Sequence, residues 1–296
     1  MSMPEPDGSS SQSEEDHAFR SRVIQWLLHR ADAERPSEQP PRGSIPRVIV
    51  QYWHDLNALP DDVEACLESW RELEQCGFER RIFDDAHATL FIAENFPSDC
   101  VEAFGRCYHP AMRCDYFRLC YILKRGGFYV DADEVYQGTE CDSLFEDERI
   151  KLQPLCYDMR TDQMVAPEEF LIDTEVSSSR IFYVNNNPII APPGHELVRS
   201  ALWRSTRILL RGSERPEIQS TTGPGNLSAS LVHHVCRMQR TNRGWDFSLL
   251  RDWQSISVCE WFLSYRNDER NWRFLNTPEG KKREEKGEEK VSGLLR

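Results

Sequence analysis

Apolar and polar positions fall into blocks along the chain, and the blocks alternate between strand-like and helix-like periods. Residues 45–54 (IPRVIVQYWH) form a short apolar run after a proline, which predicts a buried strand. Residues 61–77 begin with an acidic turn, carry apolar positions at helical spacing and stop at a glycine, which predicts a helix. A second strand is expected at 79–85 and a second helix at 84–96.

The clearest helix of the chain is predicted at residues 112–127 and leads directly into a strand. Its apolar positions share one face, and Gly126 and Gly127 end it. Residues 128–134 (FYVDADE) follow as a buried strand that runs into three acidic residues. This alternation of strands and helices predicts an α/β fold, a Rossmann-like, mostly parallel sheet flanked by helices.

The second half of the chain is less regular. We expect a strand, an Asn-rich turn and another short strand at 180–196. Helices are predicted at 195–212 and 221–238, and a late strand at 256–264.

The two ends of the chain differ in composition from the middle. Residues 1–42 are a polar segment with one amphipathic helix, predicted at 17–30, and residues 277–296 are a charged tail that is expected to be flexible. Residues 43–276 between them are expected to form one domain. The apolar face of the helix suits packing on that domain, but the arginines that accompany Trp26 also suit peripheral contact with a membrane surface.

Composition and charge narrow the classes of function. The chain has 36 Lys and Arg against 49 Asp and Glu, a formal charge of -13, which argues against broad nucleic-acid binding. No apolar stretch approaches the roughly 20 residues that a transmembrane helix needs, and no secretory signal pattern is present. The ten cysteines form no CxxC pair, so reduced, buried thiols in a cytoplasmic protein are expected.

Asp131 and Asp133 are the sharpest candidates for chemistry. Residues i and i+2 of an extended segment point to the same side, and this pair ends a strand at the edge of a parallel sheet where ligands bind. Two carboxylates there suit an oxygen-preferring cation, Mg²⁺ or Mn²⁺. We expect Asp133 to contact the metal directly, whereas Glu134 points to the opposite face.

Asp115 and Arg118 lie three residues apart on the preceding helix and therefore share a face. They can form an internal salt bridge. They can equally serve a ligand, with Asp115 accepting hydrogen bonds from sugar hydroxyls and Arg118 donating to the sugar or to phosphates.

Taken together, these residues resemble the signature of the glycosyltransferases whose sugar-binding region contains a DxD motif. That family includes yeast-type α-mannosyltransferases and, more distantly, the glucosylating clostridial toxins. Residues 114–133 are similar to its pattern S-D-x-x-R-x-x-x-L-x-x-x-G-G-x-Y-x-D-x-D, with cysteine in place of the serine. The opening IPRVIVQYW, residues 184–197 and the TGPGNL run at 222–227 are similar to its other motifs, so the resemblance covers residues 45–240.

The resemblance implies a GT-A fold, a nucleotide-sugar donor, a divalent cation and retention of the anomeric configuration. It implies that Trp53 stacks on the nucleotide base, although a core position suits this residue too. The remaining implied roles are to hold the donor sugar (Asp115, Arg118), to ligate the ribose and the metal (Asp131, Asp133) and to line the donor or acceptor pocket (Asn186, unless it only forms a turn).

Three further features are open to two interpretations each. The Gly223–Pro224–Gly225 run precedes a helix and could offer N–H groups to phosphate, or simply start the helix. His233 and His234 are expected in the core or on the surface rather than as metal ligands. Trp261, near the predicted late strand, could supply a further cation contact.

The first hypothesis is therefore a metal-dependent retaining glycosyltransferase of the cytoplasm, as in polysaccharide biosynthesis. It would move a sugar from a UDP-sugar, rather than from GDP-mannose, to a glycan or small-molecule hydroxyl, with a protein acceptor also possible. The alternatives are a toxin-like effector that glycosylates host proteins and a catalytically inactive scaffold of the same fold. A phosphohydrolase is disfavoured, because such enzymes place DxD after their first strand.

Overall fold

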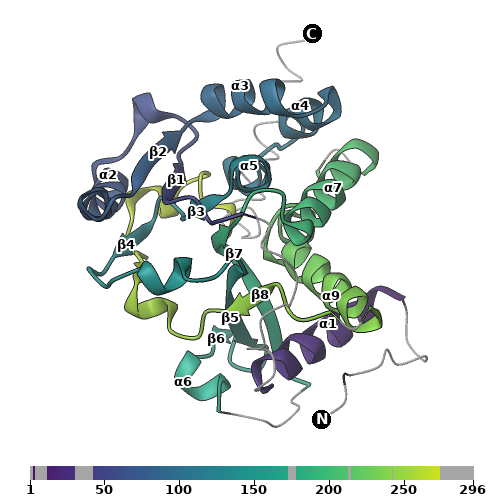
Figure 1. Ribbon diagram of the computed structural model, residues 1–296. Helices are drawn as coiled ribbons and strands as arrows, with labels where there is room; N and C mark the ends of the chain where they lie inside the picture. The colour runs from purple at the N-terminus through teal and green to yellow at the C-terminus, as the bar shows by residue number, and fades with distance from the viewer. Residues whose placement is uncertain are drawn as a thin grey trace.

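Five of the seven strands of the central sheet run in the same direction (Figure 1). The computed structural model describes residues 3, 12–30, 43–172, 178–212, 215–241 and 243–273. In order across the sheet the strands are β2 (Glu79–Phe83), β1 (Val48–Tyr52), β3 (Gly127–Tyr129), β7 (Arg180–Ala191), β5 (Ile150–Asp158) and β6 (Gln163–Met164), and β8 (Phe247–Leu249) pairs with β5. Strands β6 and β7 run against the others.

Helices flank this sheet, which confirms the predicted α/β class with a mostly parallel sheet. In chain order they are α1 (Gln12–Leu28), α2 (Asp61–Ser69), α3 (Asp85–Asn95), α4 (Ser98–Gly105), α5 (Pro110–Arg125), α6 (Pro167–Phe170), α7 (Glu196–Arg211), α8 (Ile218–Thr221) and α9 (Pro224–Arg240). Helices α1 and α9 lie beside each other and both pack on β7 (Figure 1). No helix within the described ranges is long and apolar enough to cross a membrane.

Two glycines form the turn between α5 and β3 and set the position of the strand that leads to the acid pair. Gly126 ends α5 with φ +68°, and Gly127 has φ +114°, both in the region that favours glycine. A Cβ atom on Gly127 would lie 2.8 Å from the carbonyl oxygen of Val48. Gly127 therefore lets β3 lie close beside β1, while Gly126 lets the turn pass close to Ala191 and Pro193 at the end of β7. The pairing of β3 with β1 directs the acidic residues that follow β3.

Two predicted strands differ from those observed. The predicted strand at 128–134 is divided into β3 and β4 (Glu134–Tyr136), with Asp131 and Asp133 in the short connection. Strand β4 leaves the main sheet and pairs with β9 (Ser257–Cys259), which is the short form of the predicted late strand. The acidic pair thus sits where the chain changes from one sheet to the other.

The Asn-rich turn predicted within residues 180–196 is wrong. The run Asn185–Asn187 lies inside the continuous strand β7, which pairs with β3 and β5. Asparagine favours turns because its side chain bonds to its own local backbone. Here the amides of all three asparagines bond to other elements, so the strand continues.

The N-terminal helix is part of the same core as the rest of the described chain. Val23, Ile24 and Leu27 of α1 are fully buried, and Ser21 accepts a hydrogen bond from the backbone N–H of Phe182 in β7. This packing agrees with the first interpretation of the helix. The apolar side chains that a membrane-surface role would require are buried against β7 and α9. The predicted tail at 277–296 lies outside the described residues.

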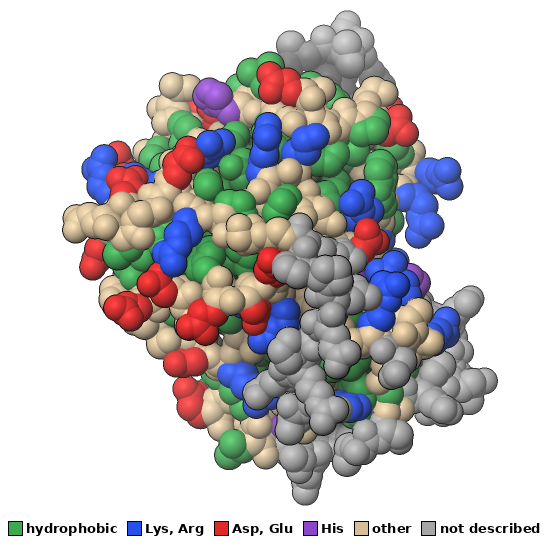
Figure 2. Space-filling view, viewed as in Figure 1, with side chains coloured by type: hydrophobic (Ala, Val, Ile, Leu, Met, Phe, Trp, Pro, Cys, Tyr) green, Lys and Arg blue, Asp and Glu red, His purple; other side chains and the backbone are tan. Residues whose placement is uncertain are grey.

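None of the ten cysteines, all of which lie in the described ranges, forms a disulfide, as expected; six of them are buried, whereas Cys76 is exposed. On the face shown in Figure 2, acidic side chains are interspersed among the basic ones.

Candidate functional site

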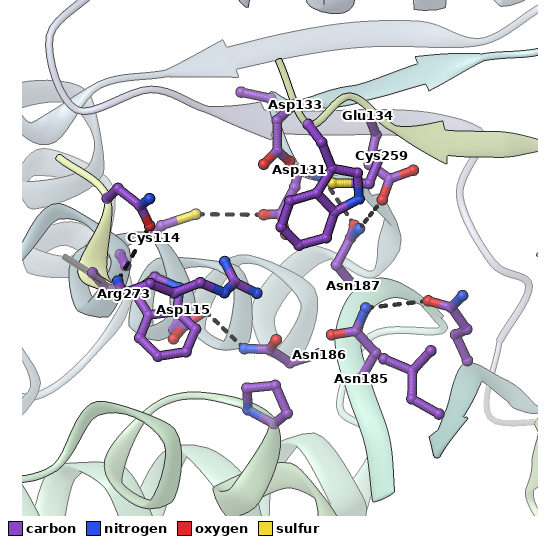
Figure 3. Close-up of a pocket in the computed structure, with 18 of the residues that line it drawn as sticks. Cys114, Asp115, Asp131, Asp133, Glu134, Asn185, Asn186, Asn187, Cys259 and Arg273 are labelled. Carbon is purple, nitrogen blue, oxygen red and sulfur yellow. Dashed lines mark hydrogen bonds between the residues drawn. The ribbon is translucent and has the colours of Figure 1, made fainter. Parts of the chain in front are cut away.

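A pocket of about 630 Å³ opens at the carboxyl ends of β1 and β3 (Figure 3). The parts of the chain that line it include the N-terminal half of α5, the connection after β3, the middle of β7 and the segment after β9. Residues of the predicted site lie on its walls, namely Trp53, Asp115, Arg118, Asp131, Asp133 and Asn186. The structure therefore brings together all six residues that the sequence singled out.

Arg118 lies at the centre of this site and is buried. Its Nη2 atom is 2.8 Å from Asp131 Oδ1 and 3.0 Å from Asp115 Oδ1. Its Nη1 atom donates to the backbone carbonyl of Asn186 over 2.7 Å, and its guanidinium lies 4.4 Å from the ring centroid of Tyr129. Helical spacing predicted only the contact between Arg118 and Asp115, and the fold brings Asp131 to the same guanidinium.

Asp115 is held on both oxygens. Asn186 donates to Oδ1 over 2.7 Å, and the Thr222 hydroxyl donates to Oδ2 over 3.2 Å. Burial raises the pKa of Asp115 to about 6, although the Arg118 cation opposes the shift. Asn186 thus positions this carboxylate from a strand and lies on the pocket wall, and its role toward a donor or acceptor stays a prediction.

Asn187 links the backbone of Asp131 to the carboxylate of Glu134, across the connection between β3 and β4. Its Oδ1 accepts from the backbone N–H of Asp131 over 2.9 Å, and its Nδ2 donates to Glu134 Oε1 over 2.9 Å. The Ser257 hydroxyl donates to the other oxygen of Glu134. Burial raises the pKa of Glu134 to about 8. Glu134 also lines the pocket, but both of its oxygens already accept hydrogen bonds within the protein.

Asp133 is held by the segment after β9. Its Oδ2 accepts from the Tyr265 hydroxyl over 2.7 Å and from Arg266 Nη2 over 2.6 Å. No short-range pattern in the sequence connects residues 133 and 266. The interleaved aromatic and arginine residues of the run WFLSYRNDERNWR are the signal that could have drawn attention to this segment.

The acid pair offers a donor set that fits a hard divalent cation. Asp133 Oδ1 accepts no hydrogen bond from the described residues, and the nearest described donor to Asp131 Oδ2 is Arg118 Nη1 at 3.5 Å. Each carboxylate therefore keeps one oxygen for a ligand, and oxygen ligands suit Mg²⁺ or Mn²⁺. No group of three or more metal-binding side chains occurs in the described parts of the chain. A cation here would need further oxygens from water or substrate.

Trp53 packs at the edge of the pocket. It is buried among Val63, Leu67 and Ala132, and its ring meets Tyr265 edge-on at a centroid distance of 5.3 Å. Its buried Nε1 has no hydrogen-bond partner among the described residues. The core interpretation of this tryptophan therefore holds, and stacking on a base stays a prediction.

The Gly-Pro-Gly run and the histidines serve the fold. The N–H of Gly223 donates to the carbonyl of Ile218 over 3.1 Å, and a Cβ on Gly225 would lie 2.9 Å from the carbonyl oxygen of Gln219. The run is therefore a tight start to α9. His234 is buried and lies 2.7 Å from Asp246 Oδ1, as expected for a core residue.

Likenesses to known proteins include a viral protein and a solved structure, and no family profile matches the chain. An uncharacterized glycosyltransferase of Acanthamoeba polyphaga mimivirus is 25% identical over 92 residues, which are 31% of this chain and 36% of that protein. The chain thus spans about a third of the curated relative that it matches. The PaToxG glycosyltransferase structure aligns with 88% of this chain and 96% of its own, at 12% identity and a TM-score of 0.41.

Proposed function

We propose that this protein is a glycosyltransferase of GT-A type that transfers a sugar from a nucleotide-sugar donor to a hydroxyl group. The observation that carries the proposal is the network of buried Asp115, buried Arg118 and half-buried Asp131 on the wall of the pocket. Withdrawing such charged groups from water is costly unless they are paired, and networks of this kind gather where a polar ligand is held. The partial likeness to a viral glycosyltransferase supports the same class.

Each of three residues would act on a different part of the donor. Asp115, fixed by Asn186 and Thr222, would accept hydrogen bonds from hydroxyls of the donor sugar. Arg118 would hold Asp131 and set the charge beside the sugar–phosphate bond. Trp53 would contact the nucleotide base at the pocket edge.

Asp131 and Asp133 would hold Mn²⁺ or Mg²⁺ through the oxygens that the protein leaves free. When bound, such a cation acts as a Lewis acid that stabilises charge on the diphosphate. Both oxygens of Asp115 already accept hydrogen bonds, which suits a positioning carboxylate better than a nucleophile. We therefore favour a retaining transfer in which the departing phosphate oxygen takes the proton of the acceptor hydroxyl.

The experiment that tests this function is a binding and hydrolysis screen of nucleotide sugars. UDP-sugars and GDP-mannose are each offered with Mn²⁺, with Mg²⁺ and with chelator, and thermal shift and released nucleotide are measured. One donor is expected to give a cation-dependent response. Asp133→Asn is expected to keep the thermal stability and lose that response. Absence of any response to every donor would overturn the proposal.

A further inference from the structure

The segment after β9 places two arginines at the pocket, and both lie against the ring of one tryptophan. The guanidinium of Arg266 lies 4.5 Å from the ring centroid of Trp261, and that of Arg273 lies 5.1 Å from the same centroid. Arg273 also lies 4.5 Å from the ring centroid of Trp272. All four side chains line the pocket, and Figure 3 shows Arg273 extending into it.

The donors of these two arginines are only partly used. Arg266 is nearly buried, with 9% of its side chain exposed, and bonds to Asp133 and to the Cys259 sulfur. Its Nε–H is buried and meets no acceptor within the described residues. Across the same ranges no carboxylate pairs with Arg273, which is held by ring contacts. A buried N–H without an acceptor is costly, so an anion beside it would be favoured.

Arg270, between them in sequence, shows the opposite arrangement. Its Nε and Nη2 atoms bind both oxygens of Asp268 over 2.7–3.1 Å. Its guanidinium is thus already satisfied by a carboxylate of the same turn. The contrast marks Arg266 and Arg273 as the arginines of this segment with capacity for a ligand.

We propose that Arg266 and Arg273 form a diphosphate subsite, a clamp whose two guanidiniums are set by the Trp261 ring. This inference rests on the proposed function and deepens it. Planar guanidiniums donate in pairs to phosphate oxygens, and they stack on aromatic faces as these do. The subsite adjoins Asp133 through the Arg266 ion pair, so the diphosphate would lie between the clamp and the acid pair.

The clamp would stabilise the charge that forms on the diphosphate when the sugar–phosphate bond breaks. When the bond between the anomeric carbon and the phosphate oxygen breaks, its electron pair stays on that oxygen. The acceptor oxygen bonds to the anomeric carbon, and the acceptor proton passes to the departing phosphate. Negative charge on the diphosphate grows along this path, so donors aimed at it stabilise the transition state more than the ground state.

The test compares the affinities of UDP and uridine, and of GDP and guanosine, by calorimetry with Mg²⁺ and with chelator. The variants are Arg266→Gln and Arg273→Gln, with Arg270→Gln as the matched control of equal charge change. Each of the first two variants is expected to lower the affinity for the nucleoside diphosphate by roughly tenfold, as for the loss of one charged hydrogen bond. The affinity for the nucleoside is expected to stay unchanged. Arg270→Gln is expected to keep the wild-type ratio.

The outcomes separate this inference from the function on which it rests. If the wild-type protein bound neither UDP nor GDP, the proposed function would be overturned. If the wild-type protein bound UDP or GDP, and Arg273→Gln kept the same ratio of nucleoside diphosphate affinity to nucleoside affinity, the clamp alone would be overturned. An equal loss of diphosphate and nucleoside in Arg266→Gln would show a structural role and also contradict it. Because Arg273 is exposed, its variant is expected to fold even if Arg266→Gln does not.

Discussion

The side-chain oxygen of Asn187 lies 2.9 Å from the backbone nitrogen of Asp131, and the amide nitrogen of the same residue lies 2.9 Å from Glu134 Oε1. One asparagine of strand β7 therefore holds both ends of the connection that carries the acid pair. The position of Asp131 is set by this amide as well as by Arg118.

Replacing Asn187 by alanine should destabilise the protein by about 1–3 kcal/mol, since a buried N–H and a buried carboxyl group lose their partner. Urea unfolding measures the change. Asn185→Ala is the matched control, because Asn185 is only half-buried and its amide donates to the Gln153 side chain. Equal losses in the two variants would contradict the role given to Asn187.

Replacing Gly127 by alanine should cost at least about 3 kcal/mol, the sum of a positive φ and of overlap with the backbone of β1. The added Cβ would lie 2.8 Å from the carbonyl oxygen of Val48. Gly77 has φ +82° with open space around it, so Gly77→Ala should cost only about 1–2 kcal/mol. Thermal unfolding of both variants checks the difference, and similar losses would refute the close approach.

Arg118→Ala should lower stability by about 3–5 kcal/mol, because it leaves Asp115 and Asp131 without their shared buried cation. Arg118→Lys restores a charge but not the paired donors, so it should recover part of that stability and little activity. Chemical unfolding and donor hydrolysis are measured together. Full activity of the lysine variant would show that charge alone suffices at this position.

His109 predicts a pH dependence that originates away from the acid pair. Its Nε2 lies 2.9 Å from the carbonyl of Glu269, and its Nδ1 accepts from the N–H of Ala111. Burial lowers the pKa of His109, with Arg113 and His54 adding to the shift and the bond to Glu269 and its charge opposing it.

The sign follows from proton binding. Below the ordinary histidine pKa of about 6.5 the unfolded chain binds a proton that folded His109 does not, so stability falls as the pH drops, by up to about 1.4 kcal/mol per unit. His109→Asn keeps a helix cap and should flatten this dependence between pH 5 and about 6.5. Unfolding curves at several pH values test it, and an unchanged slope in the variant would exclude His109 as the source.

The sequence predicted the part of the site that local periodicity controls. Helical spacing placed Asp115 beside Arg118, and the strand after Gly127 placed the acid pair at a sheet edge. The Asn-rich run was misread because its local preference for a turn was overridden by bonds to Asp115, Asp131 and Gln153, which only the fold brings near.

The partners of Asp133 could not be predicted for a related reason. Tyr265 and Arg266 lie 132 and 133 residues further along the chain, and no period or spacing rule reaches that far. The pairing depends on β4 leaving the main sheet to join β9. The apolar pattern of 128–134 does not signal this change of sheet, which takes place across the four residues between β3 and β4.

That pairing has a consequence for the way the protein is made. A nascent chain that has emerged as far as β7 already holds Asp115, Arg118, Asp131 and the asparagines, but one wall of its pocket has yet to be translated. The wall is completed only when residues 257–273 leave the ribosome and β9 docks on β4. Synthesis in this order keeps the pocket incomplete until residue 273 has emerged, so activity is expected only after that point.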